Sequence, residues 1–208
     1  MGQRITYFKS NSGKGLKETI FDHSPSFRQW YLDTAQSSVE EFNEPFGNEN
    51  LKNYLKQNTD FKTGFDNLEK NLVDELTAEF IGSYCDLIDR DNNLLMLFGP
   101  AMNKWRYAES SEMVLATKDE DFIRLWNYII KGRSLKDNAD FDSYTNDYKI
   151  GFLSFTEYMI LKEKIETYFG NIEVIKKKSN PESSGLEFVL QVLDEIADSR
   201  NELITGIE

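Results

Sequence analysis

The sequence has little of what metal centres and nucleophilic enzymes need. It contains one histidine, His23, and one cysteine, Cys85, among 208 residues. An intramolecular disulfide is therefore excluded, as are a tetrahedral cysteine zinc site and any site built on two histidines. A nucleophilic Cys85–His23 pair would need a tertiary contact that no feature of the sequence indicates. The single cysteine fits a protein of the cytoplasm.

Long hydrophobic runs are also missing. The longest apolar run covers residues 94–98, far short of the roughly 20 residues that cross a bilayer, so no membrane span is predicted. The chain has only 12 Gly and 4 Pro, against 15 Phe, 10 Tyr and 3 Trp. Such aromatic content supplies enough large apolar surface for a packed core. We expect one domain over residues 1–208, with no secretory leader pattern at its start.

Basic residues are the third shortage. The chain has 24 Lys and Arg against 36 Asp and Glu, which gives a formal net charge of −12 and a pI near 4.7. An acidic surface repels phosphate backbones and anionic lipid headgroups, so nucleic acid and membrane surfaces are not expected partners. A basic protein is the partner that this charge favours, and a merely solubilising surface is the alternative.

Hydrophobic spacing and capping signals predict a helix-dominated α+β domain with a small mixed sheet. Residues 101–117 stay ambiguous, with a helical turn over 101–107 and either helix or strand over 112–116. Whether the strand at 94–98 pairs with 3–8 or with 203–207 is also open. The predicted strands are 3–8, 94–98 (bounded by Gly99-Pro100), 172–176 and 203–207. The predicted helices are about 25–41, 50–57, 63–89, the segment between the Thr117-Lys118-Asp119-Glu120 capping box and Gly132, the segment from the Ser154–Glu157 capping box to Tyr168, and 184–196. Residues 136–148 are predicted to form a loop.

Motifs that bind phosphate or cations are incomplete. Gly13-Lys14-Gly15 lacks the other residues of a phosphate loop. The acidic stretch 89–93 starts like a calcium loop, but Leu94 stands where glycine is required and Pro100 where the bidentate glutamate is required. Carboxylates at helical spacing, such as Asp194-Glu195 with Asp198, fit a solvated helix face. The sequence therefore predicts no cofactor, no metal site and no catalytic residue.

Aromatic and arginine side chains offer the best candidates for a binding surface. The candidates are Trp105, Arg106, Tyr107, Trp126 and Arg133. These residue types bury a large area and each carries a polar group that can form hydrogen bonds, as the anchors of protein interfaces do. The alternative is that Trp105 and Trp126 are core aromatics and that Arg133 forms an internal ion pair.

The two ends of the chain resemble the YfbM-like family of bacterial proteins. The shared features are a Met-Gly start leading into a strand with Tyr7-Phe8, a helix opened by Leu153-Ser154 with Glu157 following, and a final helix that feeds the strand at 203–207. They cover about a third of the chain. The resemblance implies a small bacterial α+β domain and brings no catalytic residues with it.

We therefore expect a non-enzymatic, cytosolic protein-binding module, of the kind that immunity proteins exemplify by neutralising a basic toxin or nuclease. Two alternatives stay open. The first is a small enzyme with carboxylates, His23 or tyrosines in a cleft between helices and sheet, which requires at least two titratable groups with shifted pKa values. The second is a homo-oligomeric structural protein with a self-complementary apolar patch.

Overall fold

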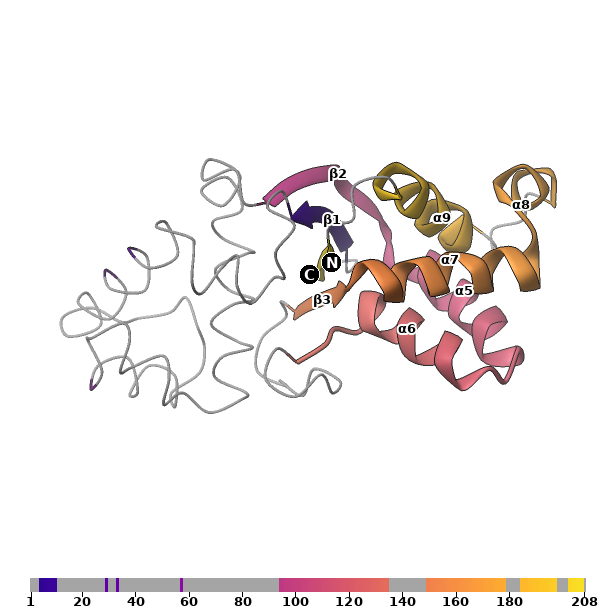
Figure 1. Ribbon diagram of the computed structural model, residues 1–208, viewed down its shortest axis with the longest axis horizontal. Coiled ribbons are helices and arrows are strands. Elements are labelled where there is room, and N and C mark those ends of the chain that lie inside the picture. The colour runs from indigo at the N-terminus through magenta and orange to yellow at the C-terminus, as the bar shows by residue number, and fades with distance from the viewer. Residues whose placement is uncertain are drawn as a thin grey trace.

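The computed structural model, drawn in Figure 1, describes residues 4–10, 94–134, 149–178, 184–197 and 202–207, and the single helical residues Gln29, Asp33 and Gln57. Side chains are described for 5–9 and, in the second range, from Tyr107 onward. The predicted helices at 25–41, 50–57 and 63–89 and the predicted loop at 136–148 otherwise lie outside these ranges. Within the first helix, Gln29 Nε2 donates to Asp33 Oδ1 at 2.7 Å, one turn away.

A four-stranded sheet joins the two ends of the chain. Its strands are β1 (Arg4–Ser10), β2 (Leu94–Asn103), β3 (Lys149–Leu153) and β4 (Leu203–Ile207), in the order β2-β1-β4-β3. The helix-dominated α+β class is confirmed. The expected mixed sheet is wrong, since all three pairs of described strands are antiparallel. Alternation within a strand does not encode the direction of its neighbour, which the connections decide.

The pairing of β2 answers the open question about residues 94–98. Met96 lies opposite Phe8 of β1, so this run pairs with the N-terminal strand. The strand does not stop at Gly99-Pro100 but continues to Asn103, so the helical turn expected over 101–107 begins only at Lys104, where the next helix starts. Proline lacks a backbone donor and is tolerated on outer strands and at bulges. Here β2 is the outer strand beside β1, and its register shifts three times between Arg4 and Phe8.

The described helices gather on one side of the sheet in Figure 1, with α7 lying between α6 and α9. They are α5 (Lys104–Ala116), α6 (Glu120–Ile130), α7 (Phe155–Phe169), α8 (Ile172–Lys178) and α9 (Ser184–Ile196). The ambiguous stretch before Thr117 is thus mostly helix. The largest fully buried side chains in the described core are Trp126, Tyr7, Tyr107, Tyr158, Phe122 and Ile5.

Capping chemistry fixes where α6 and α7 begin. Ser154 and Glu157 form the predicted capping box of α7: Ser154 N donates to Glu157 Oε2 at 2.9 Å, and Ser154 Oγ accepts from Glu157 N at 3.4 Å. At α6 the predicted box is displaced. Asp119, rather than Thr117, is the N-cap, because its Oδ1 accepts from Phe122 N at 3.0 Å.

The strand predicted at 172–176 is wrong, because these residues form α8. Gly170 has a φ of 94°, a conformation that favours glycine and ends α7. Asn171 Oδ1 then accepts from Val174 N at 3.1 Å, and Ile175 turns into the core. In so short a segment, apolar residues at 172, 174 and 175 satisfy both alternation and helical spacing, so the turn and the cap decide the outcome.

Strand β3 has no counterpart among the predicted elements. Gly151 interrupts its apolar alternation, and this glycine is required by close packing. A Cβ at this position would collide with the Tyr128 carbonyl oxygen of α6 and lie 2.5 Å from Thr205 Oγ1. The main chain of α6 therefore rests directly on the sheet at this point.

Replacing Gly151 by alanine tests that close approach. Because the new methyl group meets backbone atoms, α6 must move away from the sheet, and we expect the unfolding free energy to fall by about 3 kcal/mol. Urea denaturation followed by circular dichroism measures this. Thr156→Ala, at an exposed position of α7, is the control and should change stability by less than about 0.5 kcal/mol. An alanine variant as stable as the parent would contradict the packing described.

The capping box of α7 can be tested in the same way. Ser154→Ala leaves the Glu157 amide without its side-chain acceptor, so we expect a loss of about 1 kcal/mol. Ser154→Thr keeps a hydroxyl in place and should recover most of that loss. Equal stabilities of the two variants would show that the box does not stabilise the helix.

Candidate interaction surface

Two of the predicted binding anchors are core residues. Tyr107 and Trp126 are each 1% exposed. Tyr7 donates its hydroxyl hydrogen to Tyr107 Oη at 3.0 Å, and burial raises the pKa of Tyr107 to about 12. Trp126 Nε1 donates to Ser111 Oγ at 2.8 Å, and Ser111 Oγ in turn donates to the Tyr107 carbonyl at 2.6 Å. For Trp126 the structure matches the alternative of a core aromatic.

Arg133 is also internal, as the alternative for this residue requires. Its guanidinium carbon lies 4.4 Å from the ring centre of Tyr128 and 4.5 Å from that of Phe152. Nη1 donates to the Phe152 carbonyl at 3.2 Å and to Glu157 Oε2 at 2.8 Å. Burial alone would raise the pKa of Glu157, but hydrogen bonds from Arg133 and Ser154 hold it below its ordinary value of 4.5.

The remaining two candidates stay predictions. Trp105 and Arg106 lie in the first turn of α5, and their side chains are outside the described part of the structure.

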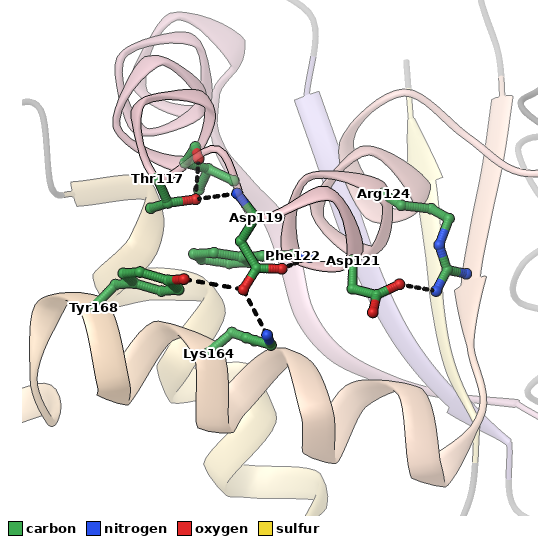
Figure 2. Close-up of polar contacts among 8 residues, drawn as sticks. Thr117, Asp119, Asp121, Phe122, Arg124, Lys164 and Tyr168 are labelled. Atoms are coloured by element: carbon green, nitrogen blue, oxygen red, sulfur yellow. Dashed lines mark hydrogen bonds and ion pairs between the residues drawn. The ribbon is translucent and has the colours of Figure 1, made fainter.

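A polar cluster around Asp119, drawn in Figure 2, ties the start of α6 to the second half of α7. Asp119 Oδ2 accepts hydrogen bonds from Lys164 Nζ at 2.5 Å and from Tyr168 Oη at 3.0 Å. The Tyr168 ring stacks on the buried ring of Phe122, with 5.7 Å between ring centres and 10° between planes. Thr117 Oγ1 accepts from Asp119 N at 3.2 Å, which orients the capping residue.

The titration of this cluster does not suit proton transfer at neutral pH. The hydrogen bond from Lys164 lowers the pKa of Asp119, and the same bond raises the pKa of Lys164. The hydrogen bond to Asp119 also raises the pKa of Tyr168. General acids and bases work best with a pKa near the working pH, whereas all three values here move away from neutrality. The cluster is a structural tie between two helices.

Residues that could hold a metal are not gathered in the described ranges, which contain no group of three or more His, Cys, Asp and Glu side chains. His23 and Cys85 lie outside these ranges. Asp194 and Glu195 are exposed on α9, as expected for a solvated helix face, and Asp194 Oδ1 pairs with Lys162 Nζ at 2.7 Å.

The outer side of α7 carries the surface feature that residue types alone did not reveal. Its buried stripe consists of Tyr158, Leu161 and Ile165, whereas Met159 and Ile160 are 37% and 38% exposed. Beside them runs an open groove of about 550 Å³. The described residues that line this groove, which we call the α7 groove, are Phe155, Thr156, Met159, Ile160, Lys162, Glu163 and Glu166.

The charge along the α7 groove is negative. Lys162 is engaged by Asp194, so that pair is neutral. Glu163 and Glu166 are exposed, and neither forms an ion pair with another residue in the described ranges. The groove therefore combines apolar side chains with two carboxylates one helical turn apart. The sequence did hold a signal for it, since Met159 and Ile160 are apolar but fall outside the stripe formed by Tyr158, Leu161 and Ile165.

Comparisons with protein-family models, with curated proteins and with solved structures found no match to this chain. The resemblance of the chain ends to the YfbM-like family therefore stays a prediction. Among the described residues, no helix has both the length and the apolar character needed to cross a membrane.

The internal ion pair predicts how stability depends on pH. Because the pKa of Glu157 is lowered by folding, its contribution is complete above about 4.5, the unfolded value, and is lost as the pH falls through the lower folded value. We expect Glu157→Gln to flatten the acid limb of the unfolding free energy, measured by urea denaturation at stepwise lower pH. Glu163→Gln removes an exposed carboxylate outside the pair and should keep the parent profile. Identical acid limbs in E157Q and parent would contradict this assignment.

Proposed function

We propose that this chain is a non-enzymatic, cytosolic protein-binding module whose partner is a basic protein. The observation that carries the proposal is the α7 groove, where two exposed apolar side chains adjoin Glu163 and Glu166 on a chain with a formal net charge of −12. Single exposed apolar residues are ordinary on protein surfaces. An apolar centre with a charged rim is the usual layout of a protein interface.

Charge supports a basic partner over a second copy of the chain. Two acidic chains repel one another, and pairing with a second copy offers Glu163 and Glu166 no net positive surface. A basic protein is instead attracted over the full acidic surface, which speeds its diffusional encounter. A toxin or nuclease with a basic surface is one partner class that fits, and this chain would then neutralise it as an immunity-type antagonist does.

The alternative of a carboxylate enzyme gains no support from the described residues. It requires a cleft with titratable groups tuned towards the working pH. The groups around Asp119 move in the opposite direction, and the carboxylates of the α7 groove are exposed.

Native mass spectrometry of the tagged protein recovered from its own host tests the proposal first. We expect a stoichiometric second protein that is basic. Its association rate, followed by stopped-flow fluorescence, should fall by roughly tenfold from about 0.03 to about 0.3 M salt because screening shortens the range of attraction.

The charges of the α7 groove can then be separated from those of the whole surface. Glu163→Lys/Glu166→Lys should slow association with that partner far more than Glu112→Lys/Glu195→Lys, which makes the same change in net charge at exposed positions of α5 and α9. A salt-independent rate, or equal effects of the two double variants, would contradict the proposal. A homodimer, or a monomer that carries a small molecule, would favour one of the two alternatives instead.

A further inference from the structure

We infer that the occupant of the α7 groove is an amphipathic helix with basic residues on its polar side, supplied by the partner. The inference rests on the proposed function, and it adds the conformation and the chemistry of the segment that binds. It concerns Phe155, Met159 and Ile160, which provide the apolar floor, and Glu163 and Glu166, which provide the charge.

The backbone of α7 explains why the occupant is a helix. Apart from the N–H groups of its first turn, the peptide groups of α7 along 155–166 bond within the helix or to its N-cap, so the groove wall beside Met159 and Ile160 has no free backbone donors or acceptors to offer. An extended segment lying there would have to leave its own peptide groups unpaired as the contact excludes water. A helical segment satisfies its peptide groups internally and contributes only side chains.

The dimensions of the α7 groove fit such a segment. Residues 155–166 cover about 17 Å of helix, which is the length of three turns. Met159 and Ile160 provide apolar side chains between Thr156 and the two glutamates. A partner helix with apolar residues at i, i+3 or i+4 and i+7 can pack on these two side chains and turn lysine or arginine side chains towards Glu163 and Glu166.

The sign of the charge selects among amphipathic helices. Burying an unpaired carboxylate is costly, so a helix with acidic residues in this position is disfavoured. Lysine or arginine would pair with carboxylates that have no ion-pair partner among the described residues. Since Lys162 is held by Asp194, it leaves the attraction of the two glutamates intact.

Three synthetic peptides of about 18 residues, long enough to form a helix on contact, test the inference. The first carries leucine on one helical face and lysine on the other. The second has the same sequence except for two central prolines, which prevent the helix, and the third replaces lysine by glutamate. Binding is measured by fluorescence anisotropy on the full chain, and helix formation by the excess circular dichroism of the mixture over its components.

We expect the first peptide to bind and to gain helicity, and the other two to bind at least about tenfold more weakly. Ile160→Ser should raise the Kd of the first peptide about tenfold, as loss of a central contact does. Leu115→Ser is the matched control, since Leu115 is 53% exposed but lies on α5, and it should change the Kd by less than about twofold. Both substituted residues are exposed, so neither variant should impair folding.

Two results would overturn the inference. Equal binding of the proline peptide would show that a helix is not required, and equal effects of Ile160→Ser and Leu115→Ser would show that the α7 groove is not the site. Either result leaves the proposed function standing if the host partner is still basic and sensitive to Glu163→Lys/Glu166→Lys. Loss of that sensitivity, by contrast, removes the proposed function itself.

Discussion

The buried guanidinium of Arg133 is the constraint on which the arrangement of the described elements depends. A charge inside a protein is costly unless it is paired and hydrogen-bonded. Arg133 is paired and hydrogen-bonded through Nη1 where three elements meet, namely Tyr128 from α6, Phe152 from β3 and Glu157 from α7, whereas its buried Nε has no partner among the described residues. Its backbone N–H also donates to the Ile150 carbonyl at 2.8 Å, which holds the segment after α6 against the sheet.

The position of α7 follows from this constraint. Glu157 is at once the partner of Arg133 and a member of the capping box, so the start of the helix is fixed in direction and in rotation. At the other end, Asp119 fixes it through Lys164 and Tyr168 (Figure 2). A helix held at both ends keeps Ile160 outward, and a preorganised surface loses less conformational freedom when a partner binds. In the proposed complex, charge would set the rate of encounter and apolar contact the lifetime.

Local signals predicted the helices that have a long apolar stripe. α7 and α9 lie close to where they were expected, since stripes of three or more turns have one helical solution. Two short segments were not predicted correctly from such spacing. α8 was expected as a strand because its few apolar positions fit both strand alternation and helical spacing. β3 was not predicted because Gly151 is required by close packing against α6, which is distant in sequence. The passage of β2 through Gly99-Pro100 likewise depends on its outer place in the sheet.

The features of the candidate site also separate into those that local sequence predicts and those that depend on tertiary packing. The sequence by itself determined the acidic charge, the single histidine and cysteine, and the caps that start α7, because each of these depends on composition or on near neighbours. Only the tertiary structure decided that Trp126 and Arg133 face inward while Met159 and Ile160 face outward. Residue type does not carry that information, since a tryptophan serves a core and an interface equally well. Burial is set by packing between elements far apart in the chain, and the ion pair between Arg133 and Glu157, 24 residues apart, is one such contact.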